Sequence, residues 1–424
     1  MNCEILAVGT ELLLGNTVNT NATRLSELLA GLGINVFWHS VVGDNPARLR
    51  DAAALARSRA DLIITTGGLG PTYDDLTKNV LADVFGKELV FHEDEAEGIR
   101  CWFAKSGRAC TENNLQQAYL PEGCTVFHND WGTAPGCAFE AEGVHVILLP
   151  GPPRECLPMF RHCAVPYLRA LTEETLVSRQ IRVFGMGESA VETYFREEME
   201  HMANPTLATY AKEGEVMLRV TAKAATEAEA AAMCEPVVEK VKNTLGDIVY
   251  GVDVDSLESL CLMLLREKHQ TFAAAESLTG GLIGARFTAL PGASEVFRGG
   301  AVTYCDEVKA AMLHIDPALI AAHGAVSHET AAAMAQGVRD AAGADIGVSA
   351  TGLAGPDGDG VHPVGTVFVG LAASDGVWVR HLTLGNARSR DIIRAISANN
   401  AYDMIRRYLT GLPVADNDSR PQGQ

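Results

Sequence analysis

The segment Ala273-Ala274-Ala275-Glu276-Ser277-Leu278-Thr279-Gly280-Gly281 marks a sharp change from strand to helix. An apolar run over 271–275 predicts a buried strand, and residues 281–287 predict a helix behind the glycine pair. Such a turn exposes a hydroxyl at a sheet end, beside the free N–H groups of a helix N-terminus. Ser277 is therefore a candidate nucleophile next to an oxyanion or phosphate site. The alternative is an ordinary turn in which Ser277 or Thr279 caps the helix, and this segment alone does not separate the two.

Around this turn, alternating strands and helices over residues 252–412 predict a C-terminal α/β domain. The further strands are expected at 297–304, 346–350, 364–371 and 377–384. The helices are expected at 257–268, 329–342 and 389–409.

The N-terminal residues 1–172 predict a second α/β domain with a doubly wound parallel sheet. Ligands of such sheets bind at the carboxyl ends of the strands. Polar segments follow the expected strands there, at 9–11, 42–45 and 65–75. In the last of these, three glycines within four residues allow a close backbone approach, and Asp74 and Asp75 are candidates to hold a divalent cation. A glycine turn followed by acidic helix-capping residues is the structural alternative.

Between these domains, residues 173–251 follow the order β-α-β-β-α-β, which predicts a small α+β domain. We interpret it as a spacer or dimerisation module. The polar residues 413–424 are expected to form a disordered tail.

The composition restricts the class of protein. Hydrophobic residues make up 47% and charged residues 21% of the 424-residue chain, as in soluble globular proteins. The net charge of −19 argues against direct nucleic-acid binding. None of the ten cysteines lies in a Cys-x-x-Cys pair, and neither a signal peptide nor a run of about 18 apolar residues is present. The sequence predicts a cytoplasmic protein without a membrane partner.

Motifs in the N-terminal domain resemble the molybdopterin-binding-type domain of the competence/damage-inducible CinA family. The matching segments are Val8–Gly15, Asn19–Ala22, Thr66–Thr72 with Asp74-Asp75, Thr111–Asn114, Gly132–Gly136 and Leu149–Glu155. The resemblance implies a MoaB/MogA-like fold and, in members of the family, a metal-dependent pyrophosphatase that acts on ADP-ribose. It also implies a KH-like or ferredoxin-like middle domain.

The C-terminal domain resembles the nicotinamide-nucleotide amidase domain of the same family. The matching segments are Ala274–Gly281, Pro291–Ser294, Thr303-Tyr304 with Lys309, His323–Ser327, Ala350–Gly358 and Pro363–Val367. The resemblance implies hydrolysis of nicotinamide mononucleotide to nicotinate mononucleotide and ammonia, without a cofactor, in pyridine-nucleotide recycling. We also expect the chain to form a homodimer.

Residue matching suggests site residues in both domains. In the N-terminal domain, the candidates for phosphate binding are Thr10, Asn19, Asn21, Gly67, Gly68, Gly70 and Thr72. The candidates for holding a divalent metal (Mg, Mn or Co) are Glu11, Asp44, Asp74 and Asp75. In the C-terminal domain, the candidates for substrate binding are Glu276, Thr279, Gly280, Gly281, Ser294, Thr351, Gly352 and Arg390.

Catalysis by the C-terminal domain would use Ser277 as nucleophile, Lys309 as base and Tyr304 to orient the serine or relay a proton. A solvated surface lysine and a strand-end aromatic residue are the structural alternatives. Position 278 is leucine where many family members have cysteine, so no thiol acts there. Residues 385–390 also depart from the shorter family motif, and Arg390 is our first choice for the substrate phosphate.

Two other functional hypotheses remain open on the sequence. The N-terminal domain alone is also consistent with a molybdopterin-binding or adenylylating protein. The family name suggests a non-enzymatic accessory factor in DNA uptake or repair, although the acidic charge argues against contact with DNA.

Overall fold

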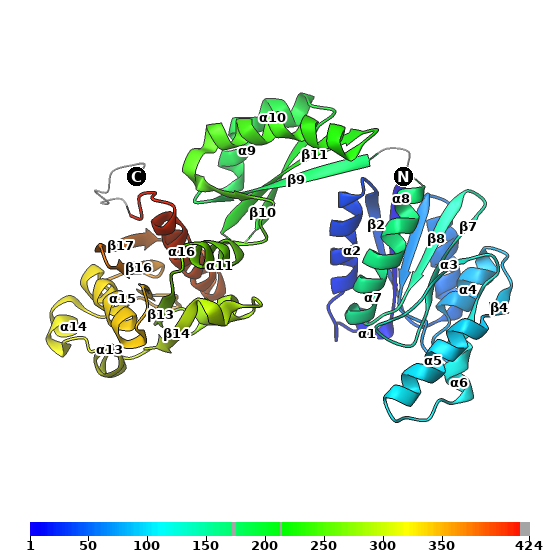
Figure 1. The fold of residues 1–424 in the computed structure, drawn as a ribbon, viewed down its shortest axis with the longest axis horizontal. Helices are drawn as coiled ribbons and strands as arrows, with labels where there is room; N and C mark the ends of the chain where they lie inside the picture. The colour runs from blue at the N-terminus through cyan, green and yellow to red at the C-terminus, as the bar shows by residue number, and fades with distance from the viewer. Residues whose placement is uncertain (172–174, 213, 416–424) are drawn as a thin grey trace. The chain divides into compact units, whose positions relative to one another are not determined.

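The computed structural model describes residues 1–171, 175–212 and 214–415 (Figure 1). The chain divides into two compact units, residues 1–177 with 223–231 and residues 178–222 with 232–424. The expected boundary at 172/173 and the tail residues 416–424 lie outside the described residues.

The N-terminal domain is built on a six-stranded sheet. Its order is β2 (Asn35–Val42), β1 (Asn2–Val8), β3 (Leu62–Thr66), β8 (Val144–Leu149), β7 (Gly136–Ala141) and β6 (Thr125–Phe127). The first four strands are parallel, whereas β7 is antiparallel to β8 and β6 is antiparallel to β7. The predicted doubly wound α/β fold is therefore confirmed, with an antiparallel edge that the pattern did not indicate.

Helices cover both faces of this sheet because successive side chains of β1 point to opposite sides. Ile5 belongs to the apolar core under α2 (Thr20–Gly31) and α7 (Pro153–Met159). Leu6 belongs to the core under α3 (Pro46–Arg57) and α4 (Thr77–Val84). The remaining elements are α1 (Thr10–Leu13), β4 (Leu89–Phe91), α5 (Glu93–Lys105), α6 (Glu112–Leu115), η1 (Gln116–Ala118), β5 (Tyr119–Pro121), η2 (Phe160–Ala164) and α8 (Val165–Ala170).

The glycine-rich turn after β3 packs tightly against the carboxyl end of β1. Gly67 has a φ of 95°, and a Cβ added there would lie 2.2 Å from the Val8 carbonyl oxygen. The turn can therefore follow this path only without a side chain at position 67.

Lys78, at the start of α4, is 5% exposed and donates through Nζ to the Gln116 carbonyl oxygen. Burial lowers the pKa of Lys78 from its ordinary value of 10.5 to about 8, although the nearby Cys137 and Asp75 act in the opposite direction. The Lys78 amine therefore loses its proton at a lower pH in the folded domain than in the unfolded chain.

The middle domain has the predicted β-α-β-β-α-β order and forms a four-stranded sheet. The sheet order is β10 (Thr206–Lys212), β11 (Glu215–Ala224), β9 (Thr175–Phe184) and β12 (Val249–Val252). Its helical segments are α9 (Glu188–His201), α10 (Glu227–Leu245) and η3 (Gly246–Ile248).

The C-terminal domain contains a five-stranded sheet. Its order is β14 (Phe297–Val302), β13 (Phe272–Glu276), β15 (Ile346–Gly352), β16 (Thr366–Ala373) and β17 (Gly376–Thr383). Strands β14, β13 and β15 are parallel, and β16 and β17 continue the sheet in antiparallel pairs. The carboxyl ends of the three parallel strands therefore lie at one edge.

Helices again cover both faces. Phe272 and Ala274 belong to a core with α11 (Leu257–Glu267), α12 (Leu282–Thr288) and α16 (Arg390–Leu409). Ala273 and Ala275 belong to the opposite core with α13 (Asp306–Leu313), α14 (Pro317–His323) and α15 (His328–Ala342). The sequence did not lead us to expect α13 and α14. A short segment η4 (Ala293–Glu295) precedes β14.

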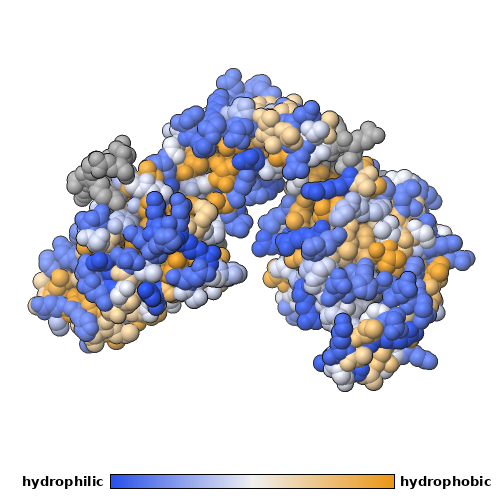
Figure 2. Space-filling model, viewed as in Figure 1, coloured by the Kyte–Doolittle hydropathy of each residue, from blue (hydrophilic) through white to orange (hydrophobic). Residues whose placement is uncertain are grey.

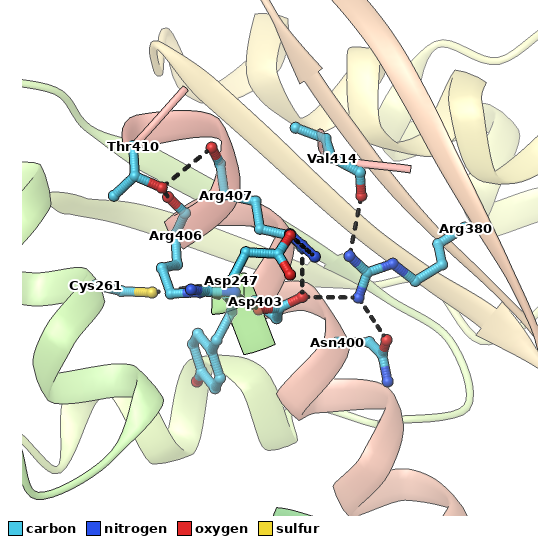
Figure 3. Close-up of polar contacts among 10 residues, drawn as sticks. Asp247, Cys261, Arg380, Asn400, Asp403, Arg406, Arg407, Thr410 and Val414 are labelled. Carbon is cyan, nitrogen blue, oxygen red and sulfur yellow. Dashed lines mark hydrogen bonds and ion pairs between the residues drawn. The ribbon is translucent and has the colours of Figure 1, made fainter. Parts of the chain in front are cut away.

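A polar network ties α16 to neighbouring segments of the same unit (Figure 3). The buried Asp403 carboxylate accepts hydrogen bonds from Arg380 at 3.0 Å and from Arg406 at 2.6 Å. Arg407 Nη2 donates to Asp247 in η3 at 2.7 Å, and Arg380 also donates to the Val414 carbonyl oxygen. Val414 is fully buried, so the expectation that the disordered tail begins at 413 is wrong for residues 413–415.

Hydrophilic residues cover most of the visible face of each unit in Figure 2, with smaller hydrophobic areas among them. Within the described parts of the chain, none of the helices combines the length and apolar character needed to cross a membrane.

We expect Gly67→Ala to lower the free energy of unfolding of the N-terminal unit by more than about 2 kcal/mol, because strain at positive φ is added to a clash with backbone. Gly15→Ala is the matched control: Gly15 also has a positive φ of 72°, but its Cβ would meet nothing within 4 Å. It should cost about 1 kcal/mol. Equal shifts in urea-unfolding midpoints for the two variants would contradict the close approach at Gly67.

The buried amine of Lys78 predicts a pH dependence of stability. Between pH of about 8 and 10.5 the unfolded chain binds more protons, so stability of the N-terminal unit should rise with pH across this interval. Lys78→Met should remove a rise of about 1–3 kcal/mol, measured by urea unfolding at several pH values. The exposed Lys105→Met serves as control and should keep the rise.

Candidate functional site

A cavity of about 610 Å³ opens at the carboxyl ends of the parallel strands of the N-terminal sheet. Ten of the predicted residues line it: Glu11, Asn19, Asn21, Asp44, Gly67, Gly68, Gly70, Thr72, Asp74 and Asp75. They come from segments distant in the sequence, which the parallel pairing of β1 with β2 and β3 brings to one edge.

Thr10 is the one predicted residue of this group outside the lining, and its contacts give it a positioning role. Its N–H donates to the Asp44 carboxylate at 2.8 Å, and its hydroxyl accepts from the Asp44 N–H at 3.1 Å. This reciprocal pair holds the loops after β1 and β2 together, so that Asp44 faces the cavity.

The segment 72–75 forms a compact polar turn. The Thr72 hydroxyl lies 2.5 Å from both Asp74 Oδ1 and Asp75 Oδ2, and the Thr72 N–H donates to Asp75 at 2.9 Å. A Cβ on Gly70 would lie 2.5 Å from the Asp75 carboxylate, so glycine is needed beside it. Both aspartates thus stand at the cavity with one side of their carboxylates engaged.

The four predicted metal-binding carboxylates suit a hard cation, since oxygen donors are what Mg²⁺ prefers. However, the described residues contain no group of three or more His, Cys, Asp or Glu side chains arranged to hold a metal ion. Magnesium is commonly bound by one or two carboxylates together with substrate phosphates and water. The donor set therefore fits an ion that only one or two of these carboxylates would hold, together with a phosphate ligand.

Six further polar residues line the cavity and were not among the predicted site residues. They are Thr17, Thr20, Thr66, Gln117, Thr133 and Glu155. The Thr133 hydroxyl donates to Gln117 Oε1 at 3.1 Å, and Glu155 Oε2 accepts from Asn129 at 3.0 Å. Thr133 and Glu155 belong to the recognised segments Gly132–Gly136 and Leu149–Glu155, but a motif does not indicate which side chain faces the cavity, and Gln117 lies outside the recognised segments.

The second candidate site lies at the carboxyl edge of the C-terminal sheet. Glu276 pairs with Val302 of β14 and with Ala350 of β15. The residue after it, Ser277, donates its N–H to the Ala350 carbonyl oxygen at 2.9 Å. Ser277 therefore lies beside Thr351 and the segment 303–304, as expected for residues that follow parallel strands.

The turn itself is held by Glu276, which is 2% exposed. Its carboxylate accepts from the N–H groups of Gly281, Ile283 and Gly284 at 2.9–3.0 Å. Neither Ser277 nor Thr279 caps α12, so the simple capping alternative is wrong. The substrate-binding prediction for Glu276 also needs correction, because the carboxylate is engaged inside the turn.

The same hydrogen bonds restrict the predicted anion site at this helix end. The Gly281 N–H is bonded to Glu276, and the Gly280 N–H donates to the Ser277 carbonyl oxygen at 3.0 Å. Neither of these two N–H groups is free to donate to an oxyanion, so the prediction is wrong for Gly280 and Gly281. The Thr279 N–H makes no hydrogen bond to the part of the chain that the structure describes, so it is the remaining donor of the three.

Two arginines of α16 reach this edge. Arg390 donates to the Tyr304 hydroxyl at 2.9 Å and to the Gly355 carbonyl oxygen at 2.5 Å. Arg394 donates to the Thr279 carbonyl oxygen at 2.8 Å. Arg394 was not predicted, although its spacing of four residues from Arg390 puts both on one helix face.

Lys309 lies in the first turn of α13 and is 1% exposed, which excludes the alternative of a solvated surface lysine. Its Nζ lies 3.5 Å from the Tyr304 carbonyl oxygen and 3.4 Å from Asp306 Oδ1. Within the described residues, Lys309 and Ser277 form no hydrogen bond with each other. Leu278 is buried in the domain core.

The structure separates Ser294 from this group. Ser294 precedes β14, and Phe297 pairs with Phe272 at the amino end of β13. Ser294 thus lies at the opposite end of the sheet from Ser277, and the substrate-binding prediction for it is wrong. Thr351 lies at the carboxyl edge of the sheet, and its hydroxyl donates to the Ala325 carbonyl oxygen at 2.7 Å. Gly352 packs closely against β16, because a Cβ added there would lie 2.6 Å from the Thr366 carbonyl oxygen.

Three family models match consecutive parts of the chain. Residues 4–170 match the probable molybdopterin binding domain, residues 178–251 the damage-inducible protein CinA KH domain, and residues 254–409 the CinA C-terminal domain.

Relatives match along almost the whole length. The chain is 48% identical over 413 residues to a putative competence-damage inducible protein of Acetivibrio thermocellus, and 49% identical over 413 residues to a CinA-like protein of Dictyoglomus thermophilum. Each alignment covers 97% of this chain and 100% of the relative. The chain therefore belongs to the CinA family, with a molybdopterin-binding-like domain, a KH-like domain and a CinA C-terminal domain.

Proposed function

We propose that the C-terminal domain hydrolyses the carboxamide of nicotinamide mononucleotide, giving nicotinate mononucleotide and ammonia. The observation that supports it is the position of the Ser277 turn beside Tyr304 and two arginines of α16 at one sheet edge. A nucleophilic hydroxyl and cationic side chains are what an amide on a phosphorylated nucleotide requires.

In this proposal Ser277 Oγ attacks the carboxamide carbon, the C–N bond breaks, and ammonia leaves. Water then hydrolyses the acyl-enzyme, releases the carboxylate and restores the serine. The Thr279 N–H would donate to the oxyanion. Lys309, when its amine is neutral, would accept the serine proton through Tyr304 or water and return it to the leaving nitrogen.

Arg390 and Arg394 would bind the phosphate of the nucleotide. Both guanidinium groups are held by carbonyl oxygens, which orient them without neutralising their charge. Asp391 lies 3.4 Å from Arg394 but its side chain is 91% exposed, so this ion pair contributes little.

We further propose that the N-terminal domain cleaves the diphosphate of ADP-ribose with a divalent metal ion. The lining of its cavity supports this proposal: it includes five carboxylates (Glu11, Asp44, Asp74, Asp75 and Glu155) and, among the described residues, no Lys, Arg or His. Such a cavity would repel a diphosphate unless a cation is bound with it. A bound divalent ion would supply the positive charge that stabilises the phosphate oxygens during cleavage.

Ser277→Ala should abolish ammonia release from nicotinamide mononucleotide, by at least about 1,000-fold, because the nucleophile is lost. Ser294→Ala is the matched control, since Ser294 lies at the other end of the sheet. It should retain near-normal turnover in the full chain. Substantial ammonia release by Ser277→Ala, with an unchanged melting temperature, would contradict the assignment.

Release of AMP from ADP-ribose should require a divalent metal ion and should stop when the metal is chelated. Asp75→Asn should reduce the rate at least about 10-fold, because it removes a charge at the cavity. Asp94→Asn, an exposed aspartate in the first turn of α5, is the control and should turn over normally. Turnover by Asp75→Asn equal to that of the control, at every metal concentration, would exclude Asp75 as a metal donor. Lack of AMP release with any divalent metal would favour the molybdopterin-binding alternative.

A further inference from the structure

We infer that Asn21 and Glu155 form a subsite that accepts hydrogen bonds from the sugar hydroxyls of a nucleotide ligand in the N-terminal cavity. The inference rests on the proposed function of this domain and names the part of the ligand that these two residues bind.

The orientation of the Asn21 amide is set by its neighbour. Asn21 Nδ2 donates to the Gly151 carbonyl oxygen at 2.7 Å. A carbonyl oxygen only accepts hydrogen bonds, so the amide nitrogen, not the oxygen, must face it. Asn21 Oδ1 is consequently directed elsewhere, and it has no hydrogen-bond partner in the described part of the chain.

This oxygen is buried, and the residue borders the cavity. Asn21 is 7% exposed and is one of the residues that line the cavity. A buried acceptor without a partner is unfavourable, and a ligand that supplies a donor removes this cost. A phosphate group has only acceptor oxygens when ionised, so Asn21 Oδ1 does not suit the phosphate that was predicted there.

Glu155 adds a second acceptor to the lining of the same cavity. It is 7% exposed, and its Oε2 accepts from Asn129 Nδ2 at 3.0 Å. Its other oxygen is 3.7 Å from Arg154 Nε, beyond hydrogen-bond distance. The segment Pro150–Pro153 joins the two acceptors, because Asn21 is bonded to Gly151 and Glu155 follows Pro153 in the first turn of α7.

Two acceptors select a neutral ligand group that donates hydrogen bonds, and the hydroxyls of a sugar have this chemistry. A site built to bind a hydroxyl strongly disfavours a ligand without it, because its buried acceptors then stay unpaired. The subsite would therefore distinguish a nucleotide sugar from a simple diphosphate.

The test compares two probes that share one uncleavable head group. One is ADP-ribose with a methylene bridge between its phosphorus atoms, and the other is methylenediphosphonate, which has no sugar. Binding to the full chain with Mg²⁺ is measured by titration calorimetry. Asn21→Leu and, separately, Glu155→Gln should each weaken binding of the sugar-bearing probe at least 10-fold and leave methylenediphosphonate binding within twofold. Asn35→Leu, the same substitution at an exposed position outside the cavity, should change neither.

Three outcomes would overturn the subsite. The first is an equal loss of affinity for both probes in the variants, which is expected if these residues hold the metal ion. The second is no loss of affinity for either probe. The third is that the unaltered chain does not bind the sugar-bearing probe. Asn21→Leu also removes the hydrogen bond to Gly151, so the melting temperature of this variant is measured. If Asn21→Leu does not fold, the result for Glu155→Gln alone tests the subsite. Hydrolysis of ADP-ribose by the unaltered chain is assayed separately, so that its failure contradicts the proposed reaction alone.

Discussion

Parallel pairing of the central strands is the constraint on which both candidate sites depend. In the N-terminal sheet, β1 pairs with β2 and β3, and in the C-terminal sheet β13 pairs with β14 and β15. Each set of strands ends at one edge, where loops far apart in the sequence meet. The pairing of Glu276 with both Val302 and Ala350 is what puts Ser277, Tyr304 and Thr351 together.

The two candidate sites carry side chains of opposite charge, although we propose a phosphorylated ligand for each. The N-terminal cavity is lined by carboxylates, so a diphosphate needs a cation to enter it. The C-terminal edge carries Arg390 and Arg394, which can meet a phosphate directly. Under the two proposals a divalent ion would therefore be needed in the N-terminal domain and not in the C-terminal domain, although both substrates are nucleotides.

The alternation of strands and helices could be predicted from the sequence because it depends on local apolar patterns. The expected helix over 257–268, for example, is α11 at Leu257–Glu267. Side-chain direction could not be predicted. Ser294 belongs to a recognised motif, but the motif does not tell whether β14 runs parallel to β13, and so at which edge of the sheet Ser294 lies. The burial of Lys309 likewise depends on α13, whose sequence gave no clear helical pattern.

Glu276 shows how a residue within a functional motif can support the site without touching a ligand. A helix N-terminus attracts anions, and the sequence therefore favoured a phosphate or oxyanion at the start of α12. In the structure the Glu276 carboxylate occupies that position and accepts from three N–H groups. The carboxylate thus takes up the positive end of the helix dipole that an anionic ligand would otherwise use. Positive charge at this edge must come from elsewhere, and the side chains that supply it are those of α16, of which Arg394 bonds to the same turn at Thr279. The turn is capped from within by Glu276, and the arginines of α16 supply the positive charge that the proposed phosphorylated substrate needs.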